Sequence, residues 1–286
     1  MGSIAVTGIT GHLGLQVIDG LLAAGVKPSD VVGLARSPER AAGIAAREVE
    51  IRLGDYDRPE TLVAALTGVD ALLLVSGSEV GKRTAQHTNV VEAAKAAGVS
   101  RIAYTSIARA DTSTISLAVE HKATEAVIKE SGLPYTFLRN SWYTENYTRD
   151  LARYLATGVI VGAAAGGKIA AATIADYAAA AVAVLTADGH VGNVYELGGT
   201  AFTMAELAAT ITDVTGTTVL YQDMSEVDFA ATLHEHAGLD EGLAAFVAGL
   251  DAAIARGELD LPSMDLETLL GRPSTPLAEA IRTAQA

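Results

Sequence analysis

The chain has 286 residues, 50% of them hydrophobic, and a formal net charge of −14. This length can bury a large core, and the hydrophobic content excludes a generally disordered chain. The absence of cysteine excludes disulfides, thiolate metal sites and cysteine nucleophiles, and the acidic balance without a basic cluster argues against nucleic-acid binding.

Over the first 140 residues, short apolar runs rich in β-branched residues alternate with longer stretches of helical periodicity. The predicted strands are 4–7, 31–34, 50–53, 71–75, 101–105 and 135–138. The predicted helices are 13–24, 38–46, 59–66, 81–97 and 117–130. This alternation predicts βαβ units and a doubly wound parallel sheet, with strands covered on both faces.

After residue 140 the pattern changes, because helical stretches dominate. The predicted strands are 159–161, 194–197 and 218–221, and the predicted helices are 145–156, 174–186, 204–214, 226–236, 241–256 and 276–283. Thr203 and Glu206 have the spacing of a capping box. We expect residues 141–286 to form a smaller, mostly helical lobe, interleaved with the first because 174–187 can pack on the sheet.

Residues 7–14 read TGITGHLG, directly after the first predicted strand and at the start of a helix. Gly8 permits a tight turn, Gly11 lets the backbone approach a pyrophosphate, and Gly14 lets the helix pack close to the strand. The pyrophosphate then lies at the helix N-terminus, beside Thr10, His12 and Leu13. The motif predicts a dinucleotide-binding Rossmann domain over residues 1–140.

The end of the second strand discriminates between the two nicotinamide dinucleotides. Rossmann proteins that select NAD usually place an acid there, which accepts from the ribose 2′-OH. This chain has Arg36, which can bind a 2′-phosphate with help from Ser37 and Arg40. The sequence therefore predicts NADP(H), although a simple surface arginine at a helix start is an open alternative.

Two further turns are candidates for cofactor contacts. Asp55 follows the third strand and can accept from the adenine amino group, with helix capping in the 55–57 turn as the alternative. Ser76 and Gly77 follow the fourth strand, where small residues let the backbone approach the cofactor.

Taken together, these residues resemble the NmrA-like group of atypical short-chain dehydrogenases/reductases, and within it the type-2 NADPH:quinone oxidoreductases and triphenylmethane reductases. The resemblance implies a two-lobed fold, a substrate cleft between the lobes, and hydride transfer from NADPH to a quinone or a similar electron-poor planar acceptor. It rests on the glycine motif, Arg36, 54–56, 86–89, 104–106, 138–147 and 270–273.

One departure concerns proton transfer. Ordinary short-chain dehydrogenases pair a serine with Tyr-x-x-x-Lys, in which the lysine lowers the pKa of the tyrosine. Here Ser106 and Lys122 stand near the serine and lysine positions, but Ala118 replaces the tyrosine. We name Ser106, Lys122 and Tyr143 as candidate catalytic residues and leave the proton donor open. A quinone needs less help, so orientation against the nicotinamide can suffice.

The segment after the sixth strand carries the candidate substrate site. Trp142, Tyr143 and Tyr147 lie at the carboxyl edge of the sheet, where an aromatic wall suits a planar acceptor. An aromatic cluster between the lobes is the alternative. Asn140 can contact the nicotinamide amide or the acceptor, or serve a turn.

Three polar side chains on helices are further candidates for contact with the acceptor. Gln86 and His87 lie on the helix after the fourth strand, and His121 lies beside Lys122. Structural roles are the alternative for each histidine. His234 and His236 are two residues apart and diverge on a helix, so we expect no metal site.

Two classes of function follow. The first is an NADPH-dependent reductase whose partner is a small-molecule acceptor: a quinone, or else an imine, a dye or an activated alkene. The second is a redox sensor that binds NADP(H) with little turnover. We expect a cytoplasmic protein without a membrane span, since the apolar stretch 178–185 is too short, and we expect a homodimer.

Overall fold

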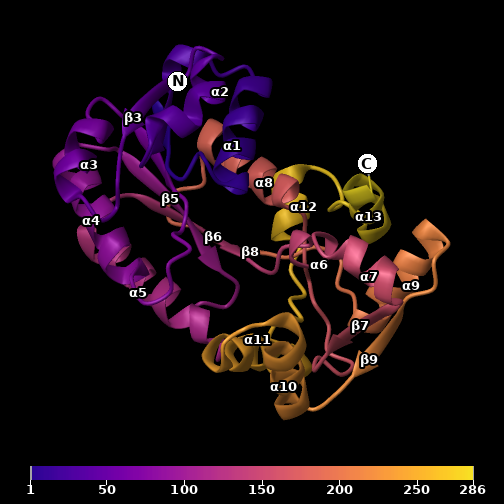
Figure 1. The fold of residues 1–286 in the computed structure, drawn as a ribbon. Coiled ribbons are helices and arrows are strands. Elements are labelled where there is room, and N and C mark those ends of the chain that lie inside the picture. The colour runs from indigo at the N-terminus through magenta and orange to yellow at the C-terminus, as the bar shows by residue number, and fades with distance from the viewer. Residues whose placement is uncertain (1, 286) are drawn as a thin grey trace.

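The structure is a computed structural model that describes residues 2–285. A seven-stranded sheet forms its centre, with helices on both faces, and a smaller group of elements stands at one end of the sheet (Figure 1). The strand order is β3-β2-β1-β4-β5-β6-β8, and every pair is parallel. The strands are β1 (Ile4–Val6), β2 (Val31–Ala35), β3 (Glu50–Leu53), β4 (Ala71–Leu74), β5 (Arg101–Ile107), β6 (Tyr135–Asn140) and β8 (Val194–Leu197).

The strand order reverses between β1 and β4, which pair directly with each other. In open parallel sheets this reversal leaves a crevice at the carboxyl ends of the two strands, where ligands bind. The glycine-rich loop after β1 therefore starts at the point where the topology opens the sheet. The Rossmann class predicted from the sequence is confirmed.

Each face of the sheet is covered by its own set of helices, because the strands are apolar on both sides. One face packs on α1 (His12–Ala23), α8 (Ile174–Thr186) and α12 (Asp265–Leu270). The other packs on α3 (Pro59–Leu66), α4 (Arg83–Ala96) and α5 (Ser116–Ser131). Short turns η1 (Pro28–Asp30), η2 (Pro38–Ala41) and α2 (Ala42–Ala45) flank β2.

The remaining elements form a second core around Tyr147, Phe202 and Leu207. Its strands β7 (Val159–Gly162) and β9 (Leu220–Asp223) pair in parallel. Its helices are α6 (Glu145–Thr148), α7 (Leu151–Thr157), α9 (Met204–Thr215), α10 (Glu226–Ala237), α11 (Glu241–Ala255) and α13 (Leu277–Gln285).

Most predicted elements match within a few residues, and the Thr203–Glu206 capping box is present. The predicted helix 145–156 is wrong in one respect: it is split into α6 and α7 at Asp150, whose φ of −95° and ψ of 6° lie outside helical geometry. The sequence also missed α12, a six-residue helix that buries only Leu266.

The chain returns to the main sheet after residue 140. Helix α8 packs against α1, and β8 extends the sheet beside β6. The fully buried carboxylate of Asp176, in the first turn of α8, accepts from Arg272 Nη2 at 2.7 Å and from the Thr275 backbone N–H at 2.8 Å. Asp176 thus fixes the segment that leads into α13.

Replacing Asp176 by alanine removes both of these hydrogen bonds and leaves the Thr275 N–H without its acceptor. We expect the free energy of unfolding, measured by urea denaturation, to fall by about 2–3 kcal/mol. Asp188→Ala, in an exposed loop, is the control and should change it by less than about 0.5 kcal/mol. Equal effects of the two substitutions would contradict this role.

Candidate active site

The glycine-rich loop turns from β1 into α1 with very little space. Gly8 has φ +62°, a left-handed conformation that other residues rarely adopt, and its carbonyl accepts from Gly11 N–H at 2.9 Å. A Cβ on Gly14 would lie 2.5 Å from the Gly8 carbonyl oxygen. The helix can approach the loop this closely only because position 14 has no side chain.

The start of α1 suits an anion. Its N-cap is Gly11, and within the described chain no side chain caps its N–H groups and no acid lies in its first turn. Thr10 and His12 are exposed there, whereas the Leu13 side chain is buried in the core. The free N–H groups and the helix dipole therefore fit a pyrophosphate.

Arg36 stands directly after β2, and its side chain is 66% exposed. It leads into the 3₁₀ turn η2. Its Nη1 lies 3.2 Å from Glu79 Oε1, in the loop after β4, and Lys82 donates to the other Glu79 oxygen. Two cations therefore stand where a Rossmann protein would read the adenosine ribose.

Tyr56 joins the carboxyl ends of three strands and was not singled out from the sequence. Its hydroxyl, buried and with a pKa raised by that burial, donates to the Val75 carbonyl at 2.9 Å and also contacts Thr7 Oγ1. In the sequence, only its position in the 54–56 turn after β3 pointed to a role at this site. Thr7 Oγ1 in turn accepts from the Val75 N–H at 2.9 Å. These contacts hold the carboxyl ends of β1, β3 and β4 together, where the strand order reverses.

The two predicted turns lie at this same edge of the sheet. Asp55 Oδ1 accepts from the Asp57 N–H at 3.1 Å, and α3 has no side-chain cap within the described residues, so the helix-capping alternative is not observed. Ser76 donates its N–H to Thr105 Oγ1, and Gly77 donates to His87 Nε2 at 3.0 Å. Side chains behind the loop thus position its backbone.

The geometry of His87 favours its structural alternative over contact with an acceptor. His87 is fully buried, and because its Nε2 accepts from Gly77, its Nδ1 carries the proton and donates to Thr124 Oγ1 at 2.9 Å. Gln86 is buried as well and donates from Nε2 to both Asp57 carboxylate oxygens. His87 thus holds the loop after β4, and Gln86 holds the loop after β3.

His121 also has a structural partner, since its Nδ1 lies 2.7 Å from the hydroxyl of fully buried Tyr104. Burial, with the nearby charge of Arg83, lowers the pKa of His87 to about 4 and that of His121 to about 3. Burial also raises the pKa of Tyr104. Both imidazoles are therefore neutral at neutral pH, and neither faces an acceptor.

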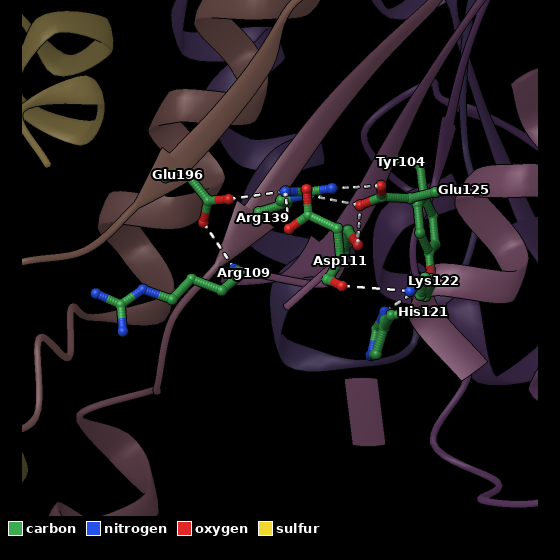
Figure 2. A network of polar contacts seen from close by, with 9 residues as sticks. Tyr104, Arg109, Asp111, His121, Lys122, Glu125, Arg139 and Glu196 are labelled. Atoms are coloured by element: carbon green, nitrogen blue, oxygen red, sulfur yellow. Dashed lines mark hydrogen bonds and ion pairs between the residues drawn. The ribbon is translucent and has the colours of Figure 1, made fainter. Parts of the chain in front are cut away.

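Arg139, Glu125, Glu196 and Asp111 form an ionic network at the carboxyl edge of the sheet (Figure 2), and the buried Ser106 is bonded to it. Its hydroxyl donates to Glu125 Oε1 at 2.7 Å. Arg139 binds both Glu125 oxygens, at 2.9 and 2.7 Å, and also donates to Glu196 and to Asp111. Desolvation works against the charge on Arg139, but its carboxylate partners prevail and raise its pKa. The Ser106 hydroxyl thus uses its one donor hydrogen for the bond to Glu125.

Among the described residues, the Lys122 ammonium group is bonded to a partner other than Ser106. Its exposed ammonium group donates to the Asp111 backbone carbonyl at 3.3 Å (Figure 2), and Ala118 is buried in the position that a catalytic tyrosine would need. Ser106 and Lys122, two of the three candidate catalytic residues, thus each have a different protein partner.

The loop after β5 also connects the two cores. Arg109, with φ +51°, donates its N–H to Glu196 Oε2 at 2.8 Å, and its guanidinium donates to the carbonyls of Gly257 and Asp260. The Glu258 carboxylate accepts from Ser113 Oγ at 3.0 Å. The ionic network is thereby linked to the segment after α11.

The aromatic residues after β6 divide between the cores instead of forming one wall. Tyr147 is buried against Phe202, and Trp142 packs on that same second core. Tyr143 faces the main core, edge-on to Tyr177 with ring centroids 5.3 Å apart. Tyr143 is therefore the member that lies beside the sheet.

Asn140, the last residue of β6, has an unused acceptor. Its Nδ2 points to the Tyr143 hydroxyl at 3.5 Å, whereas its Oδ1 and the neighbouring Ser141 Oγ are buried without a partner among residues 2–285. Buried polar atoms are normally hydrogen-bonded, so these two indicate a place for a polar ligand.

Residues 2–285 contain no cluster of three or more histidine or acidic side chains with the geometry of a metal site. None of the helices in the same range combines the length and apolar character needed to cross a bilayer.

Comparison with known proteins agrees with this geometry. Residues 8–184 match a family described as NAD(P)H-binding. The sequence is 49% identical to quinone oxidoreductase 2 of Escherichia coli over 97% of each chain. It is 31% identical to an NmrA-like family domain-containing oxidoreductase of Aspergillus flavus, over 97% of this chain and 93% of that protein.

Two crystal structures superimpose over the whole fold. The NADPH-dependent quinone oxidoreductase of Escherichia coli complexed with NADPH gives a TM-score of 0.95 at 48% identity, covering 99% of this chain and 100% of that one. The Citrobacter sp. triphenylmethane reductase complexed with NADP(H) gives 0.94 at 40% identity, with the same coverage.

Gly14→Ala tests the close approach of α1 to its loop. Because the new Cβ would meet the Gly8 backbone, α1 must shift, and we expect a loss of about 1–3 kcal/mol in unfolding free energy. Calorimetric affinity for a nicotinamide dinucleotide should fall at least about 10-fold. Gly43→Ala, whose Cβ would meet nothing within 4 Å, is the control; equal behaviour of the two variants would refute the argument.

The two buried histidines predict a pH dependence of stability. Their pKa values in the fold lie below the ordinary 6.5, so the unfolded chain binds protons that the folded chain does not. The free energy of unfolding should therefore fall as the pH drops from about 7 to about 5, by up to about 1.4 kcal/mol per unit and histidine.

This dependence can be measured by urea unfolding of His121→Gln, which should show a shallower decline than the parent. His236→Gln, at an exposed position, is the control and should keep the parent slope. An unchanged slope in His121→Gln would contradict a lowered pKa of His121 in the fold, since the group would then bind protons equally in both states.

Proposed function

The chain belongs to the NAD(P)H-binding family, and on that premise we propose that it is an NADPH-dependent reductase that transfers hydride to a quinone or a similar electron-poor planar acceptor. The observation that carries this proposal is the full-length likeness to the NADPH-dependent quinone oxidoreductase of Escherichia coli, in sequence and in fold. The likeness to triphenylmethane reductase supports a planar acceptor as the broader class.

We propose that the pyrophosphate binds at Gly8, Gly11 and Gly14 and at the N–H groups of Thr10, His12 and Leu13. The uncapped α1 and the lack of space for a side chain at Gly14 support this assignment. Arg36 then binds the 2′-phosphate, Asp55 accepts from the adenine amino group, and the backbone of Ser76 and Gly77 lines the middle of the cofactor.

At the other end of the cofactor, we assign Asn140 to the nicotinamide carboxamide. Its orphaned Oδ1 can accept from the amide nitrogen, and Ser141 Oγ offers a second polar contact. Tyr143 is the aromatic residue beside this position and the remaining candidate for contact with the acceptor. Bound NADPH supplies the hydride, and the quinone also takes up a proton from solvent to become the hydroquinone.

The contribution of the chain itself is then binding and orientation. Ser106 donates to Glu125 and Lys122 donates to a backbone carbonyl, so neither is free for acid–base work in this geometry. A quinone suits such a site, because aromatisation stabilises its reduced form and alignment against the nicotinamide lowers the remaining barrier.

We propose two interleaved lobes: a dinucleotide-binding lobe from residues 1–140, joined by α8, β8 and α12, and a substrate lobe from the rest of 141–286. The packing of α8, β8 and α12 on the main sheet supports including them in the first lobe. A cytoplasmic location and a homodimer remain predictions from the sequence.

Consumption of NADPH, followed by its near-ultraviolet absorbance, tests the proposal. We expect oxidation that requires an added quinone and is slower with NADH. Arg36→Glu should lower kcat/KM for NADPH about 10- to 100-fold, because a charged contact to the 2′-phosphate is lost, while NADH is little affected.

Arg282→Glu reverses the same charge on α13 and is the matched control. Normal NADPH turnover by Arg36→Glu would refute the 2′-phosphate assignment. Tight NADPH binding without turnover across quinones and dyes would instead favour the sensor alternative.

A further inference from the structure

Glu79 lies between two cations at the edge where Arg36 stands. Its Oε1 is 3.2 Å from Arg36 Nη1, and its Oε2 accepts from Lys82 Nζ at 2.8 Å. The two oxygens of one carboxylate therefore hold one cation each. Glu79 is the least exposed of the three, at 37% of its side chain, against 66% for Arg36 and 61% for Lys82.

A 2′-phosphate and Glu79 would compete for the same guanidinium. A phosphate monoester carries about −1.5 to −2 charges at neutral pH and binds arginine best through two parallel hydrogen bonds. Arg36 can offer its full fork to such a group only if Glu79 releases Nη1. The carboxylate would also repel the incoming phosphate.

Four interacting charged groups meet at this point. Arg36 and Lys82 supply two positive charges, and Glu79 supplies one negative charge. Asp57, whose negative charge acts on Lys82, supplies the second. Asp57 is itself held by the Gln86 amide. Among these four groups the positive charges are therefore matched by negative ones before any phosphate arrives.

We propose that Glu79 is a specificity-determining residue, which occupies Arg36 when no 2′-phosphate is present and passes to Lys82 alone when one binds. The proposal rests on the assignment of Arg36 to the 2′-phosphate. Lys82 acts indirectly, since it already holds Glu79 Oε2 and can keep the carboxylate when Arg36 leaves it. Glu79 therefore weakens NADPH binding and leaves NADH binding unchanged. The ratio of NADPH affinity to NADH affinity is then smaller than it would be without Glu79.

The test measures dissociation constants of NADPH and NADH by isothermal titration calorimetry at low salt. We expect Glu79→Gln to bind NADPH about 2- to 5-fold more tightly, the range of an exposed ion pair, with no change for NADH. The gain should shrink at high salt, because exposed charges are screened. Lys82→Met should weaken NADPH binding by a similar factor.

The double variant Glu79→Gln/Lys82→Met separates direct from indirect action. If Lys82 acts by holding Glu79, its replacement has a much smaller effect once the carboxylate is gone. An undiminished effect would overturn this part of the proposal and make Lys82 a direct phosphate ligand. Glu92→Gln and Lys95→Met, at exposed positions of α4, make the same charge changes and should leave both affinities unchanged.

Two results are decisive and distinguishable. NADPH binding by Glu79→Gln that is weaker than that of the parent would overturn the proposal, since it would mean that Glu79 helps by ordering Arg36. NADPH binding unchanged in Arg36→Gln would instead overturn the 2′-phosphate assignment on which the proposal rests. Normal dependence on Arg36 with no effect of Glu79 would refute only the present inference.

Discussion

A buried arginine organises the carboxyl edge of the sheet. Arg139, at the end of β6, cannot lose its charge, so the fold must surround it with carboxylates. It finds Glu125 on α5, Glu196 on β8 and Asp111 on the loop after β5. Each partner comes from a different element, and Arg139 and Glu125 form a buried pair, for which removal of one partner commonly costs about 3–5 kcal/mol, whereas Asp111 is exposed. The relative positions of these elements are therefore tightly constrained.

The same network limits the chemistry available nearby. The Ser106 hydroxyl donates a hydrogen bond to Glu125, and Arg109, which is linked to Glu196, donates to a carbonyl in the segment after α11. Ser106 and Lys122, which stand near the serine and lysine positions of ordinary short-chain dehydrogenases, are thus bonded to α5 and to the loop after β5, and Arg109 joins this network to the second core. An acceptor that needs only hydride delivery and a solvent proton is consistent with such a site.

At the cofactor end, polar side chains behind the loops position their backbone. Tyr56 and Thr7 tie the ends of β1, β3 and β4 together, and His87 holds the Gly77 amide from below. In contrast to these buried contacts, Arg36, Glu79 and Lys82 lie at the surface and can exchange partners at small cost. The buried contacts therefore suit the groups that NADH and NADPH share. The three surface residues suit the 2′-phosphate, which only NADPH carries.

The sequence by itself determined the sheet, the glycine-rich turn and the family, because these depend on local patterns: apolar runs of strand length, helical periodicity, and glycines at fixed spacing. It also placed Arg36 at the end of β2. Only the tertiary structure decided what His87, Gln86 and Ser106 do, because a polar residue on a helix or strand looks the same whether it faces a ligand or another element. The partners of these residues lie between 10 and 37 positions away along the chain, and only folding brings them together.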